Sequence, residues 1–522
     1  MAKRNFVWLA ILLITPALVT AQAPGDQSMK LSLQECLAKA MRNNLGVAVQ
    51  MLTPELGEAA VAQANEKFLP SVTLDFGRQS TQNASSNFLD AADVATNNYN
   101  IYSGTFNQQI PGGGNLSMRL NASRYDTNRT GQTVNPRYNS ELRFSFTQPL
   151  LKNFGLKTSK REIIVAKTRL NQSEKDLERS LQQTVYNVEQ AYWNLVYAME
   201  NYEVTEQSLK YAQDLLERNQ RSVEVGTMAP IEIISAEAEV ARLEASMLVA
   251  EAQIRNEEDR LKQILNLRAE DPQADLIRIE PTDVPEERLS EVSLDEALNT
   301  ALQNRPDLAS TRLGIQNSEF DVRYQKNQLL PNLSFDASYW SPGLSGTQLI
   351  LNPDDPFGPA LAQIPGGITD SFKDVFGFTY KNWAMGLTLD IPFNAIFSRA
   401  ALAQAQINLD SALLQLKEQE LQIYTDIKIA VRNVETAYKT IQALKIARQL
   451  SERQLEAVTE KLKVGLSTNF EVLQYQRDLS SAQASELNAV IQYNMALAAL
   501  ERDMGVSLDR NNVTIANPTG GR

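Results

Sequence analysis

The stretch "VGTMAPIEIISAEAEVARLEA" (Val225–Ala245) is matched near the other end of the chain by "VGLSTNFEVLQYQRDLSSAQA" (Val464–Ala484). In both copies a Val-Gly pair separates a long, proline-free helical pattern from a second, shorter one. Glycine tolerates a positive φ and therefore suits a tight turn at a helix end. We predict that the chain reverses direction at both places, in turns at 225–228 and 463–468.

The two stretches belong to a duplication that organises the whole chain, and a pattern of this kind is sought before any other. The segment Leu31–Val47 recurs as Val292–Leu308, and "NVEQAY" (Asn187–Tyr192) recurs as "NVETAY" (Asn433–Tyr438). The predicted organisation is a signal peptide at 1–23, a first repeat at 24–267, a linker at mid-height at 268–291, a second repeat at 292–507 and a disordered tail at 508–522.

Long helices are expected on both sides of each turn. Apolar residues such as Val188, Tyr192 and Leu195 recur in steps of four and three, which predicts coiled-coil packing. The longest run would span about 105 Å at 1.5 Å per residue. Each repeat also contains a medium helix and the helix after the turn. Stacked end to end, these two are about as long as the longest run. The predicted helices are 155–224 and 229–265 in the first repeat and 394–462 and 469–505 in the second.

Strands are expected where apolar and polar residues alternate, as Leu142, Phe144 and Phe146 do with their polar neighbours. Such segments are typical of a membrane β-barrel, although a soluble sandwich gives the same local pattern. A hairpin at about 100–126 either adds two strands to the barrel or lies outside it in a long loop. The other predicted strands are at about 70–80, 139–149, 331–341 and 381–392.

Four strands in one chain are too few to close a barrel, for which about eight are the practical minimum. Cyclic oligomerisation would supply the missing strands and cover the apolar helix faces. Three copies would bring 12 strands, or 18 with the hairpin. The predicted fold class is therefore mainly α with a membrane β-barrel portion, a duplicated protomer of long antiparallel helices completed by trimerisation.

Composition narrows the function. Lys3 and Arg4 precede an apolar stretch, Phe6–Val19, that is too short to span a membrane well, which indicates a secretory signal. The chain has no histidine and a single cysteine, Cys36, so it lacks the commonest general base and zinc ligand and cannot form an internal disulfide. We expect no catalysis, cofactor or metal site. A net charge of −12 with dispersed basic residues argues against nucleic-acid binding.

In their order and spacing, these features resemble the outer-membrane efflux protein family (TolC-like channels). The likeness covers essentially the whole mature chain. It is carried by the duplication, the two turn motifs, the strand starts at Leu69-Pro70 and Leu330-Pro331, and "FTQPLL" (Phe146–Leu151).

The resemblance implies a homotrimer with a barrel in outer-membrane lipid and a helical tunnel through the periplasm. It implies a passive exit duct of a tripartite efflux pump or a type I secretion system. The implied partners are a periplasmic adaptor (membrane fusion) protein and an inner-membrane RND or ABC transporter. The alternative is a structural trimeric coiled-coil envelope protein or adhesin with a barrel anchor and no transport role.

The resemblance also assigns residues to the tip of the tunnel. Glu232 and Glu471 each follow a turn glycine by six positions and would line the periplasmic constriction with Gln474; a solvated surface position is the alternative for the acids. Three-fold symmetry would make each acid a ring of carboxylates that attracts cations. The residues expected to contact the adaptor are Val225, Gly226, Thr227, Val464, Gly465, Leu466 and Ser467.

Three positions depart from the family's best-known member. Gln474 stands in place of a second acid, and Leu462 and Ser467 stand in place of a Tyr and an Arg that help to latch the closed tip there. We hypothesise that other residues hold this tip closed, with Arg221, Lys461 and Lys463 as the candidates.

Overall fold

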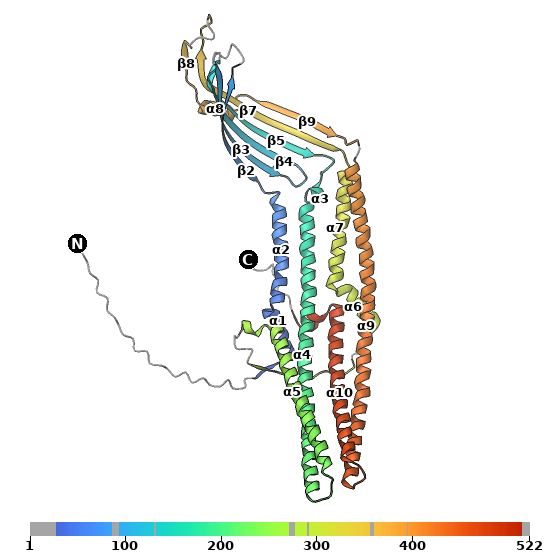
Figure 1. The fold of residues 1–522 in the computed structure, drawn as a ribbon. Coiled ribbons are helices and arrows are strands. Elements are labelled where there is room, and N and C mark those ends of the chain that lie inside the picture. Colours follow the sequence, from blue (N-terminus) through green and yellow to red (C-terminus); the bar gives the residue numbers. More distant parts are fainter. Residues whose placement is uncertain are drawn as a thin grey trace, which may run out of the picture.

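A computed structural model shows a long rod of helices that carries a curved β-sheet at one end (Figure 1). The structure describes residues 28–85, 93–129, 132–270, 277–289, 292–354, 360–393 and 395–513. The predicted signal peptide at 1–23 and residues 514–522 of the predicted tail lie outside these ranges. None of the described helices combines the length and the apolar character that a membrane span requires.

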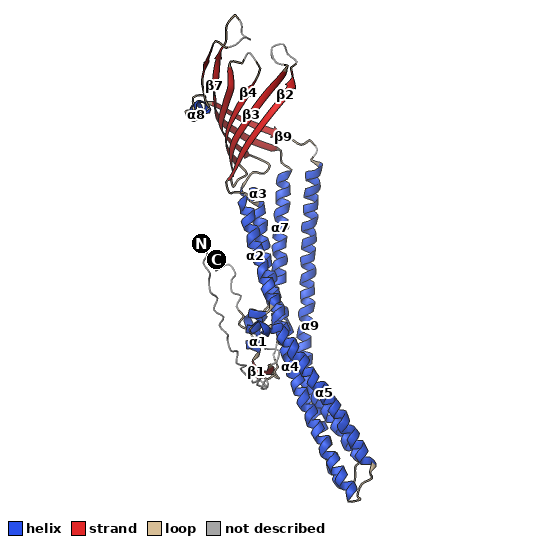
Figure 2. Cartoon of the chain, turned by 60° about the vertical axis from the view of Figure 1, so that its left-hand side comes forward, coloured by secondary structure: helices blue, strands red, loops and turns tan. Residues whose placement is uncertain are grey.

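Two helices run along most of the rod, α4 (Arg161–Glu224) with 64 residues and α9 (Ile396–Lys463) with 68. Each lies beside two shorter helices that follow one another along it (Figures 1 and 2). These partners are α2 (Leu45–Glu66) and α5 (Ile231–Leu265) for α4, and α7 (Pro306–Gln328) and α10 (Asn469–Met504) for α9.

The first long helix begins later than the sequence pattern indicates. Residues 156–159 form a separate short helix, α3 (Leu156–Ser159), before α4 starts at Arg161. Gly155 has a φ of 102°, and Lys160 (φ −90°, ψ 15°) leaves the helical region between the two helices. A backbone kink of this kind leaves no mark on the apolar periodicity, so the pattern could not reveal it.

The seam between the two stacked helices is closed by side chains that serve both. Asn44 caps α2, because its Oδ1 accepts from the Val47 amide at 3.1 Å, while its Nδ2 donates to the Ile264 carbonyl of α5 at 2.8 Å. Asn266, just past α5, donates in return to the Asn43 carbonyl at 2.9 Å. One bridge therefore satisfies backbone groups that both helix ends would leave without partners.

The second repeat closes the same seam with a different residue. Arg305, the duplicate of Asn44, lies between α6 (Leu294–Asn304) and α7 and reaches the Asp503 carbonyl of α10 at 3.5 Å. Gly505 ends α10 with a φ of 76°, and a Cβ there would lie 2.9 Å from Asn304 backbone atoms. Both the conformation and the close approach therefore require glycine.

A small mixed layer surrounds these seams at mid-height. It contains α1 (Leu33–Asn43), a parallel pair of strands, β1 (Ser28–Leu31) and β6 (Arg278–Pro281), and the turn η2 (Leu267–Ala269). Cys36 is fully buried in the adjoining core. Burial raises the pKa of its thiol to about 12, which keeps it protonated and unreactive.

The expected disordered tail at 508–522 is wrong for its first residues. Residues 507–510 form α11 (Ser507–Arg510), Leu508 is buried against α4, and Asn511 Nδ2 donates to the buried Glu189 carboxylate at 2.9 Å. Burial raises the pKa of Glu189 to about 7. This short polar segment is ordered by contacts with a distant helix, which local composition does not reveal.

Six long antiparallel strands form the sheet, in the order β2-β3-β4-β5-β7-β9, and a short strand, β8, pairs with the far part of β7. The β3–β4 hairpin lies inside the sheet between β2 and β5, so the alternative of an external hairpin is wrong. The bounds are β2 (Ser71–Ala84), β3 (Val94–Gln109), β4 (Asn115–Thr127), β5 (Val134–Pro149), β7 (Asn332–Ile350), β8 (Ala362–Ile364) and β9 (Asn382–Asp390).

Most strands continue past the limits expected from alternation. β7 runs to Ile350 instead of ending near 341, β2 continues to Ala84, and β5 begins at Val134. Only β9 is shorter, because it ends at Asp390. The added residues are largely polar and pair across strands, as where Thr127 Oγ1 donates to Asn97 Oδ1 at 3.0 Å. Polar strand ends of this kind resemble loop sequence.

The sheet has one apolar and one polar face, which the strand register makes explicit. Phe144 pairs with Met118 and Tyr339, and Phe146 pairs with Leu116 and Ala337, so these side chains share the apolar face. The polar face carries residues such as Asp75, Arg119, Glu141, Arg143 and Asp336. Among the described strands, β2 pairs only with β3 and β9 only with β7, so both outer edges are free.

We predict that Asn44→Ala lowers the free energy of unfolding by about 1–2 kcal/mol, because it removes an N-cap and leaves the Ile264 carbonyl unpaired. Denaturant unfolding followed by circular dichroism measures the change. Asn65→Ala is the matched control, since the exposed Asn65 amide bonds only to its own helix, and it should shift the value by less than about 0.5 kcal/mol. Equal losses in both variants would contradict the bridging role of Asn44.

Candidate functional site

The end of the rod farthest from the sheet is formed by the two Val-Gly turns. Gly226 and Gly465 both have a φ of 77°. The amides of Thr227 and Leu466 donate to Ser222 and Lys461 carbonyls, each at 2.9 Å, and so close the two helix ends. A Cβ on either glycine would meet open space, so the backbone conformation alone favours glycine there.

Apolar side chains at this end project into solvent. Val225, Val464 and Leu466 are 74%, 69% and 77% exposed, and Phe470 is similarly open. Thr227 is also exposed, but its hydroxyl donates to the Ser222 carbonyl at 2.9 Å. Large apolar side chains gathered at an exposed tip are typical of a surface that contacts another protein.

Glu471 has a local structural role. It is the third residue of α10 in a capping box: the Thr468 hydroxyl accepts from the Glu471 amide at 3.3 Å, and the Glu471 carboxylate accepts from the Thr468 amide at 3.2 Å. The Ser467 hydroxyl donates to the same carboxylate. These two hydrogen bonds, with Ser467 first, lower the pKa of Glu471. Its side chain is exposed, so its charge remains available at the tip.

Glu232 lies in a different environment, half-buried where the two turns meet. Asn469, at the start of α10, donates from Nδ2 to Glu232 Oε2 at 3.2 Å. Gln474, one turn further along α10, is exposed and donates to Asp478 at 3.0 Å. In one chain, therefore, Glu232 joins the two hairpins, whereas Glu471 and Gln474 face outward.

A second link between the hairpins was not anticipated from the sequence. The buried Glu239 carboxylate on α5 binds Arg477 Nη2 of α10 at 2.7 Å and Arg242 Nε of its own helix at 3.0 Å. Burial opposes its ionisation, but the hydrogen bonds from Arg242 and Arg477 prevail and lower the pKa of Glu239. The spacing of Glu239 and Arg242 indicates a pair on one helix. Nothing in the sequence connects either residue with Arg477.

Of the residues considered at the tip, Arg221 and Lys463 pair within their own helices, whereas Leu462 packs in a cluster that joins the two hairpins. Leu462 packs against a cluster centred on Leu215 and Val458. Arg221 pairs with Glu217, and Lys463 pairs with Glu460 at 2.6 Å, each on the same helix. That Arg221, Lys461 and Lys463 hold this tip closed stays a prediction.

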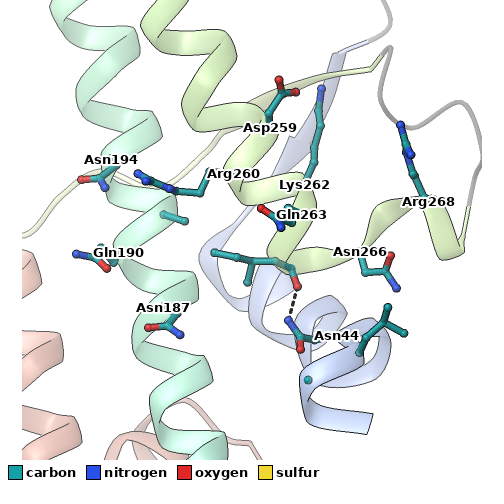
Figure 3. Close-up of a pocket in the computed structure, with 14 residues that line it drawn as sticks. Asn44, Asn187, Gln190, Asn194, Asp259, Arg260, Lys262, Gln263, Asn266 and Arg268 are labelled. Atoms are coloured by element: carbon teal, nitrogen blue, oxygen red, sulfur yellow. Dashed lines mark hydrogen bonds between the residues drawn. The ribbon is translucent and has the colours of Figure 1, made fainter. Parts of the chain in front are cut away.

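A cavity at mid-height is the other candidate site. It is lined mainly by amides and cations from α4, the end of α5 and the start of α2, and Figure 3 shows the Asn44–Ile264 bond at its edge. Its volume is about 1190 Å³, and one side is open. Over the described ranges, no group of His, Cys, Asp and Glu is placed to hold a metal. The charged residues of its lining are Asp259, Arg260, Lys262 and Arg268.

We predict that Arg477→Met loosens the tip, because it removes the charge that binds buried Glu239 across the hairpins. Amide hydrogen exchange in α5 and α10 near these residues should become faster by roughly 10-fold. Arg255→Met is the control, since exposed Arg255 pairs only with Glu251 on its own helix. Unchanged exchange in Arg477→Met would show that the Glu239–Arg477 pair does not join the hairpins.

The comparisons with known proteins agree with this architecture. A family model described as "Outer membrane efflux protein" matches residues 115–267 and 297–506, which together exceed half of the chain. The outer membrane protein TolC of Vibrio cholerae is 21% identical over 384 residues, which are 73% of this chain and 80% of the relative.

Two solved structures share the fold. The Campylobacter jejuni CmeC outer membrane channel superposes with a TM-score of 0.63 at 16% identity, over 91% of this chain and 86% of that one. The outer membrane protein VceC from Vibrio cholerae gives a TM-score of 0.61 at 16% identity, over 91% and 96%.

Proposed function

The chain belongs to the outer membrane efflux protein family, and on that premise we propose that it is the exit duct of a tripartite efflux pump or of a type I secretion system. It is an outer-membrane protein whose helical part extends into the periplasm. The duct conducts its cargo passively, and an inner-membrane RND or ABC transporter supplies the energy. A periplasmic adaptor joins that transporter to the tip.

The observation that carries this proposal is the pairing of a two-faced sheet that has free edges with a distant, exposed helical tip. In a homotrimer, β9 of each copy pairs with β2 of the next, and three sets of six long strands close an 18-strand barrel. The apolar face then meets lipid and the polar face lines the channel. The helix pairs continue the wall of the channel into the periplasm.

The tip has two tasks in this proposal. The exposed side chains of Val225, Thr227, Val464 and Leu466 contact the adaptor, with the backbones of Gly226 and Gly465 and the side chain of Ser467 shaping the surface. Glu471, Gln474 and Glu232 line the constriction. The two acids differ in role in this proposal. The exposed Glu471 side chain is free to face the channel, whereas Glu232 also joins the two hairpins through its hydrogen bond with Asn469.

We predict that Glu471→Gln lowers the preference of the open channel for cations by roughly two-fold or more, since it removes one ring of charge. Glutamine keeps the capping box, so the fold of α10 should be unchanged. Single-channel recordings in planar bilayers measure the selectivity. Thr468→Ala is the reverse control: it weakens the cap by about 1 kcal/mol but keeps the charge, so selectivity should persist. Unaltered selectivity in Glu471→Gln would show that Glu471 does not line the constriction.

We predict that deleting the gene makes cells sensitive to compounds that the pump exports, and that Leu466→Asp fails to restore resistance. A charge at this exposed apolar position opposes contact with the adaptor without disturbing a core. The readout is the minimal inhibitory concentration of a panel of drugs and metals. Val284→Asp, a change at an 85% exposed position at mid-height, is the control and should restore resistance. Wild-type sensitivity of the deletion strain to every exported class would instead favour a structural role.

A further inference from the structure

A short helix, α8 (Ile368–Phe376), lies against the sheet and takes no part in the rod or the tip (Figures 1 and 2). It belongs to the connection between β8 and β9 and packs on β5 and β7. Ser371 Oγ lies 2.6 Å from Ser140 Oγ and 3.1 Å from the Gly343 carbonyl oxygen, and Val375 is fully buried. A Cβ on residue 343 would lie 2.1 Å from the Ser371 carbonyl oxygen, so glycine makes room for the helix.

The register shows that α8 lies on the apolar face. Ser140 pairs with Gly343, and two residues further along the strands Leu142 pairs with Ser341. Side chains two residues apart point to the same face, so Ser140 shares a face with Leu142 and Phe144. The helix therefore covers the side that meets lipid in the proposed barrel. It lies over two interior strands, whereas the free edges of the sheet belong to β2 and β9.

At the level of α8, the residues on this face of the sheet change from apolar to polar. The cross-strand row beneath the helix still contains Phe76 and Tyr102, whereas the next row of the same face is polar. The row at the helix is Phe76, Tyr102, Ala122, Ser140 and Gly343, and the next row is Arg78, Asn100, Arg124, Tyr138 and Ser345. On β7 the apolar face thus runs from Leu333 to about 343, close to the 9–11 residues of a tilted strand that spans a membrane.

The side of α8 that does not touch the sheet is amphipathic. Phe372 and Phe376 are four residues apart and share a stripe, with ring centroids 6.0 Å apart, and Phe376 is 58% exposed. Asp370 and Lys373 pair at 2.9 Å and lie next to this stripe, on the side of α8 turned away from the sheet. The apolar stripe therefore faces sideways along the sheet surface, and the charged side faces away from it.

More aromatic residues follow α8 in the chain and lie on the neighbouring part of the apolar face. Phe378 packs against Tyr339 with centroids 5.9 Å apart, and Trp383, which pairs with Tyr339 across strands, is exposed, as is Tyr380. Aromatic residues gather at the two borders of the apolar band of outer-membrane barrels. A helix with one aromatic stripe and one charged side is suited to the boundary between headgroups and acyl chains.

We propose that α8 is an interfacial helix that inserts Phe372 and Phe376 into the outer leaflet and marks the outer limit of the embedded band. The partner is a lipid surface, because the aromatic stripe continues the apolar face of the sheet. The inference rests on the proposed placement of that face in the membrane. It adds a peripheral anchor to each copy, outside the closed ring of strands.

Spin labelling of the full chain in vesicles of phosphatidylcholine and phosphatidylglycerol tests this assignment. A nitroxide is attached at Phe376→Cys, at Lys373→Cys on the charged side, and at Met118→Cys in the middle of the apolar face. Buried Cys36 does not compete for the label. Collision rates with molecular oxygen, which concentrates in lipid, and with a water-soluble nickel chelate are then compared.

The expected ratio of oxygen to nickel collisions at 376 is roughly 3-fold or more above that at 373 and approaches the ratio at 118. Equal ratios at 376 and 373 would overturn the proposal by making α8 a solvated loop helix. Protection of 376 from both reagents would also overturn it, because a protein surface such as a second copy would then cover the helix. A low ratio at 118 would overturn the proposed membrane placement itself, and the inference with it.

Discussion

The architecture depends on one constraint: two helix ends meet against an unbroken helix, and the backbone groups at that junction need partners. In the first repeat Asn44 and Asn266 bridge the junction with side-chain amides. In the second repeat Arg305 and Gly505 close it with a guanidinium and a close backbone approach. The rod can be long because each seam is closed at mid-height, and the layer with β1, β6 and α11 gathers around these seams.

The parts of the fold that could be predicted from the sequence are those marked by a regular spacing of apolar residues or by a repeated motif. The steps of four and three in α4, the alternation around Phe144, and the duplicated turn motifs each repeat often enough to indicate a type of element. The strand ends were missed because residues such as Asn97 and Thr127 pair across strands and carry no apolar signal. The order in α11 was missed because it comes from a contact with Glu189, far away in the chain.

At the tip, too, only the features set by local sequence could be predicted. The positions of Gly226 and Gly465 follow from turn chemistry, and both have the positive φ that this chemistry requires. The capping role of Glu471 was also within reach, since Thr468 precedes it by three residues. The bond between Glu239 and Arg477 was not, because it joins two helices from different repeats. Local spacing indicates which residues can cap or pair within a helix but not which helices meet.

The free edges of β2 and β9 have a consequence for biogenesis. A strand edge presents a row of unpaired amides and carbonyls, and hydrocarbon offers these groups no partner. A single copy is therefore poorly suited to enter the bilayer alone, and its sheet is exposed to faulty pairing until neighbours arrive. In the proposed trimer, the last step of maturation depends on the concentration of chains at the membrane, so the local synthesis rate bears on yield along with the stability of the protomer.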